Sequence, residues 1–180
     1  LEKAERLEAL INEFFDITRF NLTTLTLQPE QISMSRMLEQ LASEFVPILD
    51  SMDLTWHTEI SPDIEIFCDP DKLERVFDNL VRNAVNYSYS GTEIFLSLKK
   101  EEDHVVVKVQ NSGKTIPPDK LSRIFEQFFR LDSSRSSATG GAGLGLAISK
   151  EIVELHGGTI TAASENNSVL FTVTLPLSAP

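Results

Sequence analysis

Apolar and polar residues recur along the chain with two different periods, and each change of period marks the end of a predicted element. Apolar residues spaced three and four apart predict helices over residues 34–52, 69–87 and 147–156. Alternation with a period of two predicts strands over residues 54–60, 64–68, 93–99, 105–110, 159–164 and 169–175, with a short strand within 25–33. Asp69 or Asp71 is expected to cap the second helix, and Pro47 is expected to kink the first helix or end it early.

Together these elements predict one α/β domain. Short polar links join the strand pairs within 93–110 and 159–175, which favours hairpins and a partly antiparallel sheet. Each predicted helix has a single apolar face, so we expect three helices to cover one face of one sheet. Gly157 and Gly158 are expected to end the last helix.

Residues 1–20 carry a separate amphipathic pattern. Leu7, Leu10, Phe14 and Ile17 follow one another at helical spacing with charged residues between them, which predicts a helix with an apolar seam compatible with a coiled coil. An isolated helix of this length is marginally stable in water, so the seam needs a partner. We favour a dimer or bundle element, and packing on the chain's own domain is the alternative.

Composition restricts the classes of function. A net charge of -11 over 180 residues argues against a nucleic-acid surface, which requires clustered Lys and Arg. The single Cys68 excludes an internal disulfide, fits a reducing compartment, and is most simply a small buried residue. No apolar run approaches the roughly 20 residues that span a bilayer. Because the chain starts at Leu1, we expect it to be a piece of a longer protein.

A glycine-rich stretch, GGAGLGL at residues 140–146, directly precedes the last predicted helix. Glycines let a ligand approach the main chain, and a helix N-terminus offers unpaired N–H groups, so the combination suits phosphates. A flexible linker is the alternative. No Lys-Ser/Thr follows the last glycine and no apolar strand precedes the stretch, which argues against a Walker loop and a dinucleotide-binding fingerprint.

Two asparagines, Asn79 and Asn83, lie four apart in the helix predicted over 69–87 and therefore share one side of it. Asparagine is a poor helix former, so two of them in mid-helix favour a functional reading. An amide oxygen is a suitable ligand for Mg²⁺, which takes substrate phosphates as further ligands. Local hydrogen bonding or exposure to solvent is the alternative.

Four stretches resemble, in order, the four boxes of the catalytic domain of sensor histidine kinases: NLVRNAVNYS, NSGKTIP, IFEQFFR and GGAGLGLAISKEIVELHGG. Those kinases belong to a wider ATPase family shared with gyrase, Hsp90 and MutL. The resemblance covers residues 22–176 and implies an ATP-binding catalytic domain over 22–180, with a mixed, largely antiparallel sheet under three helices. ERLEALINEFFDITRF resembles the second helix of the dimerisation and phosphotransfer hairpin, which assigns residues 1–21 to that hairpin. FFRLDSSRSSATGG further resembles the VanS-type kinases of vancomycin resistance.

The resemblance implies ATP and Mg²⁺ as ligands. Asn83 would hold the Mg²⁺ that bridges the phosphates, and Asn79 would lie one turn away beside them. Hydrolases of the wider family have a general-base glutamate at the position of Asn79, and an amide cannot take a proton from water, which favours a kinase. Arg130 would meet the γ-phosphate and stabilise charge on the transferring group. Arg82 and Arg135 are weaker candidates, with solvated surface arginines as the alternative.

The resemblance also implies a base pocket. Tyr87 would flank the nucleotide, and Asn86 replaces the usual lysine, so one phosphate cation is missing. Asn111 stands where the family has an aspartate that accepts a hydrogen bond from the adenine amino group, and an uncharged oxygen there implies lower affinity. Gly113 would let the base approach and Ile116 would line the pocket. Residues expected to close over the phosphates are Gly141, Gly143, Leu144 and Gly145, with residues 132–139 as a lid.

None of His57, His104 and His156 has the sequence context of the family's phosphoacceptor, so that histidine is expected on another segment. The resemblance implies transfer of the γ-phosphate to this histidine and then to a response regulator, in a homodimeric two-component kinase. It places this fragment in the cytoplasm and the membrane anchor elsewhere in the full-length protein, with no contact to nucleic acid or membrane by the fragment. Asn86 and Asn111 motivate an alternative, a nucleotide-sensing interaction domain without catalysis. An anti-sigma-type serine kinase is a second alternative, and a dinucleotide enzyme a third.

Overall fold

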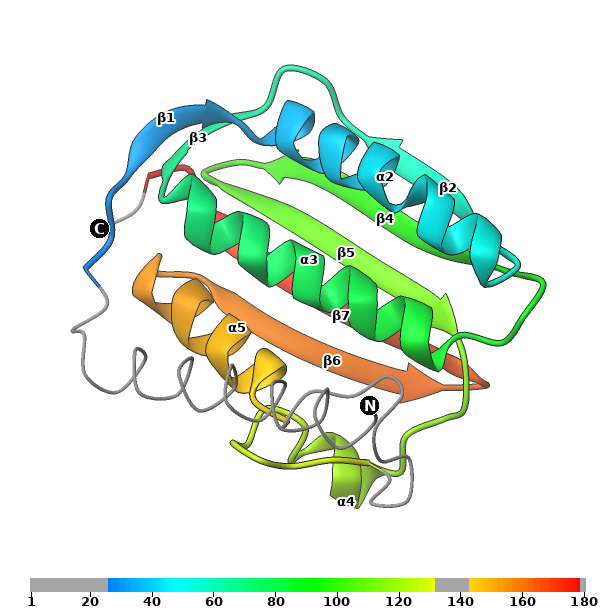
Figure 1. Ribbon diagram of the computed structural model, residues 1–180. Helices are drawn as coiled ribbons and strands as arrows, with labels where there is room; N and C mark the ends of the chain where they lie inside the picture. Colours follow the sequence, from blue (N-terminus) through cyan, green and yellow to red (C-terminus); the bar gives the residue numbers. More distant parts are fainter. Residues whose placement is uncertain (1–25, 132–142, 179–180) are drawn as a thin grey trace, which may run out of the picture.

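The computed structural model describes residues 26–131 and 143–178, which form a two-layer α/β fold (Figure 1). One layer is a five-stranded sheet in the order β2 (Leu54–Ile60), β4 (Thr92–Glu101), β5 (His104–Ser112), β7 (Ser168–Pro176) and β6 (Thr159–Glu165). β2 and β4 are parallel, and the other neighbouring pairs are antiparallel. The predicted mixed, largely antiparallel sheet is confirmed.

The second layer consists of helices that lie side by side on one face of the sheet: α2 (Met34–Ser51), α3 (Pro70–Tyr87) and α5 (Gly145–Leu155) (Figure 1). The predicted covering of one face by three helices is therefore confirmed. A short helix, α4 (Pro118–Leu121), lies between β5 and α5 in the sequence. β1 (Glu30–Ser33) and β3 (Glu65–Cys68) pair in a separate two-stranded sheet rather than in the main one. The helix predicted over residues 1–20 lies outside the described residues.

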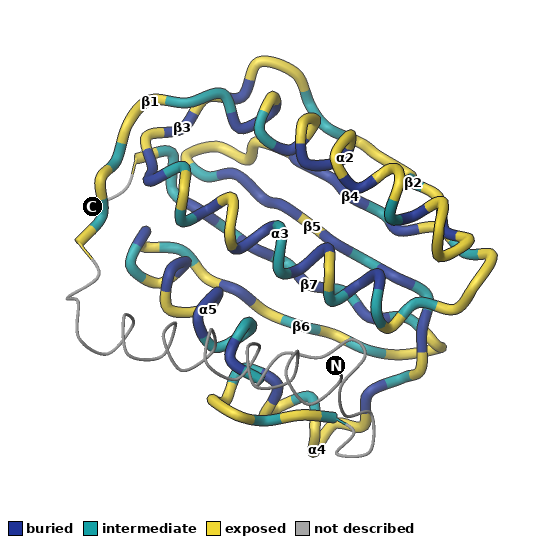
Figure 2. The backbone as a smooth tube through the Cα atoms, viewed as in Figure 1, coloured by how far each residue is buried: buried dark blue, intermediate teal, exposed yellow. Residues whose placement is uncertain are grey.

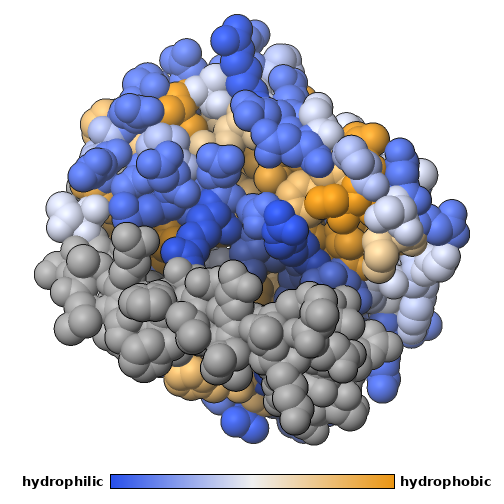
Figure 3. All heavy atoms as spheres, in the orientation of Figure 1, coloured by the Kyte–Doolittle hydropathy of each residue, from blue (hydrophilic) through white to orange (hydrophobic). Residues whose placement is uncertain are grey.

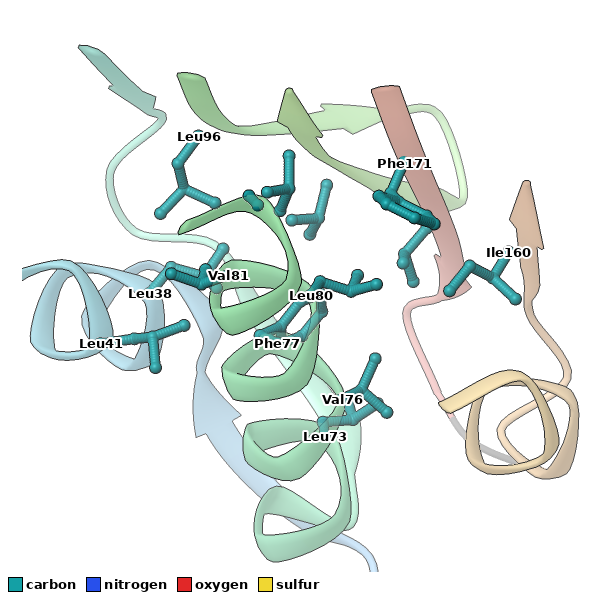
Figure 4. Close-up of a cluster of buried hydrophobic side chains, with 14 of the residues drawn as sticks. Leu38, Leu41, Leu73, Val76, Phe77, Leu80, Val81, Leu96, Ile160 and Phe171 are labelled. Carbon is teal, nitrogen blue, oxygen red and sulfur yellow. The ribbon is translucent and has the colours of Figure 1, made fainter. Parts of the chain in front are cut away.

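The core lies between the helices and the sheet, and it follows from the two periods of the sequence. On β5, Val105, Val107 and Val109 are buried toward the helices, whereas Lys108 between them is exposed on the other face. α2, α3 and α5 turn their buried sides toward the strands (Figure 2). In Figure 4, Phe77 and Leu80 of α3 lie in one cluster of core side chains with Leu38 and Leu41 of α2 and Phe171 of β7. Burial of such side chains contributes about 1.5–3 kcal/mol each.

Of the two outcomes expected of Pro47, a kink or an early end of the first helix, the early end is wrong. α2 continues through Pro47 to Ser51, and Pro47 itself is exposed. Phe45 and Leu49, on either side of Pro47, are buried in the core, so packing holds both parts of the helix in place. The loss of one main-chain hydrogen bond at an exposed position is tolerated under that constraint.

Asp69, at the start of α3, is hydrogen-bonded within the helix and to two other parts of the chain. The buried Asp69 carboxylate caps the helix by accepting from the Lys72 main-chain N–H at 3.2 Å, and it also accepts from the Gln28 N–H at 2.9 Å and from Lys72 Nζ at 2.7 Å. The Asp69 N–H donates to Nε2 of buried His156 at 3.0 Å, and His156 Nδ1 lies 2.7 Å from the Ile152 carbonyl oxygen. Desolvation raises the pKa of Asp69, but the hydrogen bonds from Lys72 and Gln28 outweigh it, so the net pKa is lowered.

Replacing Asp69 with alanine is expected to destabilise the fold by about 2–3 kcal/mol, because the cap and the partner of the Gln28 N–H are both lost. For a chain of this size that lowers the melting temperature by about 4–12 °C. Since the folded pKa is depressed, the stabilisation is present above the unfolded pKa of about 3.9 and disappears as the pH falls through the folded pKa. Thermal unfolding at pH 7 and pH 3 measures both effects. Asp71→Ala, in the exposed first turn, is the matched control, and an equal shift in both variants would contradict the assignment.

The Cys68 thiol, at the end of β3, is buried. Burial, and then the nearby carboxylates of Asp69 and Glu30, raise its pKa from 9.0 to about 12. The thiolate is therefore about a thousandfold scarcer at neutral pH than in an ordinary cysteine, and the thiolate is the reactive form. We expect no alkylation of Cys68 in the folded chain at pH 8 and rapid alkylation in denaturant, as followed by mass spectrometry. Rapid alkylation of the folded chain would contradict the burial.

Candidate functional site

One flank of α3 is polar and lines a pair of neighbouring cavities. The core side of the helix is apolar, whereas Asn79, Asn83 and Asn86 follow one another at spacings of four and three and are half-buried. The spacing keeps all three amides along one side of the helix. Tyr87 is 38% exposed and also lines these cavities.

The first cavity, of about 190 Å³, lies between the C-terminal end of α3, the end of β5 and the segment that follows β5. Buried Ile116 and Val169 give it an apolar lining, and Tyr87 and Tyr89 add aromatic side chains. The full lining is Asn83, Asn86, Tyr87, Ser88, Tyr89, Asn111, Lys114, Thr115, Ile116, Pro117, Lys120, Leu131 and Val169. An apolar slot with aromatic walls suits a flat ring such as a nucleotide base.

Asn111, on β5, is the buried polar residue of this cavity. Its side chain is 2% exposed, and its Nδ2 has no hydrogen-bond partner among the described residues. A buried amide donor without a partner is costly and calls for an explanation. A ligand in the cavity that accepts a hydrogen bond would supply the missing partner.

Hydrogen bonds donated by main-chain N–H groups fix the segment that follows β5 and lines the first cavity. Gly113 N–H donates to the Asn167 carbonyl at 2.9 Å, and Asn167 N–H donates to Thr115 Oγ1 at 2.9 Å. Ile116 N–H donates to Ser164 Oγ at 2.9 Å. The segment after β5 is thereby fixed to the β6–β7 turn. Sequence reasoning did not find Ser164 or Asn167, which lie about 50 residues away along the chain.

Two segments of the main chain approach each other closely at Gly113 and Tyr87. A Cβ on Gly113 would overlap the Tyr87 carbonyl oxygen and lie 3.0 Å from Asn111 Nδ2. Only glycine therefore lets the end of α3 and the end of β5 approach closely enough to form the two sides of the first cavity.

The second cavity, of about 270 Å³, adjoins the first and shares part of its lining, including Asn83, Asn86 and Tyr87. Asn79, Arg82, Arg130, Gly143 and Gly145 line the remainder, together with apolar side chains. This cavity gathers amides, two guanidinium side chains and the start of α5. Neither cavity alone reaches the roughly 300 Å³ typical of small-molecule sites, but the two together do.

The start of α5 adjoins the second cavity. Leu144 occupies the N-cap position, and no side chain among the described residues caps this helix end. Its side chain is buried in the core, so Leu144 can offer a ligand only main-chain groups. Gly143 has φ +79°, a conformation that favours glycine, and a Cβ there would lie 2.7 Å from the Phe129 carbonyl oxygen. Gly141, predicted to close over the phosphates, lies outside the described residues.

Asn79 connects α3 to α5. Its Nδ2 donates to Oγ of buried Ser149 at 3.0 Å, and a Cβ on Gly145 would overlap its Oδ1. The structure thus brings Asn79, Asn83, Arg130, Gly143 and Gly145 to one cavity. Ser149 was missed because nothing in its own sequence context indicates a partner 70 residues away.

The fold and these paired cavities define an ATPase domain, and the chain belongs to the histidine kinase-, DNA gyrase B-, and HSP90-like ATPase family, whose sequence profile matches residues 68–179. It is 50% identical over 179 residues to the sensor protein VanSC of Enterococcus gallinarum and 48% identical over 176 residues to the sensor protein VanS of Enterococcus faecium. These alignments cover 99% and 98% of this chain but 49% and 46% of the relatives, so the chain spans about half their length.

Solved structures place the fold in the same group. The catalytic domain of histidine kinase ThkA superimposes with a TM-score of 0.75 at 25% identity, covering 84% of this chain and 97% of that domain. The chain is thus a histidine-kinase-type ATPase domain, and its family implies an ATP site. Within residues 26–131 and 143–178, no helix combines the length and the apolar composition that crossing a membrane requires.

Proposed function

We propose that this chain is the ATP-binding catalytic part of a sensor histidine kinase, with adenine in the first cavity and the phosphates in the second. The observation that carries this proposal is the continuity of the two cavities. The first is partly apolar and contains the buried Asn111, whose Nδ2 has no partner among the described residues, and amides, arginines and the start of α5 line the second. An adenine base with its charged phosphate tail has the same division into a flat, largely apolar part and an anionic part.

Asn83 is proposed to hold Mg²⁺ together with the phosphates. It lines both cavities and therefore lies where base and phosphates would join. Among the described residues no three His, Cys, Asp or Glu side chains form a metal-binding group, which suits a metal that arrives with the nucleotide. When bound, Mg²⁺ would neutralise phosphate charge.

The groups around the second cavity fit phosphoryl transfer better than hydrolysis. Asn79 carries an amide, which takes no proton from water, and its Nδ2 is engaged by Ser149. Arg130 is exposed at the cavity lining, where a guanidinium stabilises charge on a transferring phosphoryl group. In the proposed step the bond between the γ-phosphorus and the β–γ bridging oxygen breaks, a phosphorus–nitrogen bond forms to a histidine, ADP leaves, and the imidazole proton is released.

The acceptor histidine is proposed to come from a hairpin of the same kinase, and a response regulator would then take the phosphoryl group. His156 is buried and held by two hydrogen-bonding partners. His57 and His104 lie on β2 and β5 with acidic neighbours, and neither lines the two cavities. All three histidines of the chain lie within residues 26–178, so the proposed acceptor lies outside these 180 residues.

Phosphorylation in trans tests the proposal. The chain is mixed with labelled ATP, Mg²⁺ and a separately expressed hairpin of the intact kinase that carries the acceptor. We expect a phosphorylated hairpin whose label is lost in acid and kept in alkali, as for phosphohistidine. Acid-stable label would indicate a serine kinase instead. ATP binding without transfer to the hairpin would favour a nucleotide-sensing interaction domain.

A further inference from the structure

In the first cavity, where we propose that the base binds, the buried polar group is the Asn111 amide instead of the aspartate usual in the family. Of the residues that line the first cavity, Asn111 alone among those described is both polar and buried. Ile116 N–H is used by Ser164, and Thr115 Oγ1 accepts from Asn167, so these groups are already engaged. The Asn111 amide is therefore the main buried group that can form hydrogen bonds with the edge of a bound base.

An amide and a carboxylate read a base edge differently. The amide offers one acceptor, Oδ1, beside one donor, Nδ2, whereas a carboxylate offers acceptors only. Adenine offers a donor at the 6-amino group beside an acceptor at N1, and a 6-oxopurine offers the reverse, an acceptor at O6 beside a donor at N1. An Asn amide matches either edge, because a half-turn of the amide exchanges Oδ1 and Nδ2.

Nothing among the described residues holds the Asn111 amide to one of these orientations through Nδ2, since that atom has no partner. The half-turn therefore breaks no hydrogen bond of Nδ2. The buried apolar side chains of Ile116 and Val169 in the lining form no hydrogen bonds and would not distinguish one 6-substituent of a base from another.

We infer that Asn111 makes this site accept both 6-amino- and 6-oxopurine nucleoside triphosphates, with the amide turned one way for each. The inference rests on the proposed function, because it concerns the base end of the same nucleotide site. It assigns to Asn111 the role of a specificity-determining residue.

The experiment compares the binding of ATP and ITP, each with Mg²⁺, to the wild-type chain and to Asn111→Asp by calorimetry. ITP is chosen over GTP because guanine adds a 2-amino donor that a carboxylate could also bind. We expect wild-type dissociation constants for ATP and ITP within about fivefold of each other. In Asn111→Asp, the carboxylate faces O6 of ITP without a donor, so ITP should bind at least about tenfold more weakly relative to ATP.

Asn111→Ala separates base reading from a merely structural role. It removes donor and acceptor together, so both nucleotides should weaken while their ratio stays near the wild-type value. Strong rejection of ITP by the wild-type chain, or an unchanged ratio in Asn111→Asp, would overturn the inference and leave the proposed function standing. Failure of the wild-type chain to bind either nucleotide at millimolar concentration would overturn both.

Discussion

Gly113→Ala is expected to abolish detectable ATP binding and to lower the melting temperature by about 3–10 °C. The added methyl group would overlap the Tyr87 carbonyl oxygen, a main-chain atom that cannot turn away, and would also crowd Asn111 Nδ2. Relief requires the end of α3 to separate from the end of β5. Both ends line the first cavity, so both stability and binding should suffer.

Calorimetry with ATP and thermal unfolding together measure this effect. Gly91→Ala is the matched control, because Gly91 has φ +77° but a Cβ there would meet only Asp53 Oδ2, at an ordinary 3.6 Å. The control variant should lose some stability from backbone strain and keep its affinity for ATP, because Gly91 lines neither cavity. Wild-type affinity in Gly113→Ala would show that the close approach of the main chain at Gly113 to that at Tyr87 is not needed for binding.

Asn83→Ala is expected to remove the gain in ATP affinity that Mg²⁺ provides and to reduce phosphotransfer by about a hundredfold. Asn83 lines both cavities, and we propose that its amide oxygen holds the Mg²⁺ that binds the phosphates. Alanine is a better helix former than asparagine, so α3 should not weaken. The measurement is ATP affinity with Mg²⁺ and with EDTA.

Asn86→Ala controls for the loss of an amide on the same flank of α3. It lines both cavities as Asn83 does, but we assign it no metal, so its effect on affinity should be equal with Mg²⁺ and with EDTA. An Asn83→Ala chain that keeps the full Mg²⁺-dependent gain would show that the metal is held by other groups.

Local sequence signals predicted most of the fold because the elements depend on near neighbours. The cap at Asp69 and the alternation Val105–Val107–Val109 each act within a few residues, and the structure has both. The same local reasoning was wrong in allowing Pro47 to end its helix early. There the outcome depends on what Phe45 and Leu49 contact across the core, which the sequence of the helix does not contain.

The candidate site was predictable as a set of motifs but not as a connected structure. Asn79, Asn83 and Asn111 were identified from their motifs, and the structure brings them to adjoining cavities. The hydrogen bonds that position the site join residues far apart in the chain, as with Asn79 and Ser149. Nor could the sequence show that Asn111 Nδ2 is left without a partner, since that is a property of everything packed around it.

The position of β7 in the sheet has a consequence for how the chain folds during synthesis. β7 leaves the ribosome after the other four strands of this sheet, yet it lies between β5 and β6 in the interior, paired with β5 along its whole length and with β6 over residues 168–174. Until it arrives, β5 has an open edge, and β6 has no neighbour. Because such long-range pairing forms slowly and exposed strand edges promote association, nascent chains should depend on chaperones until β7 is released.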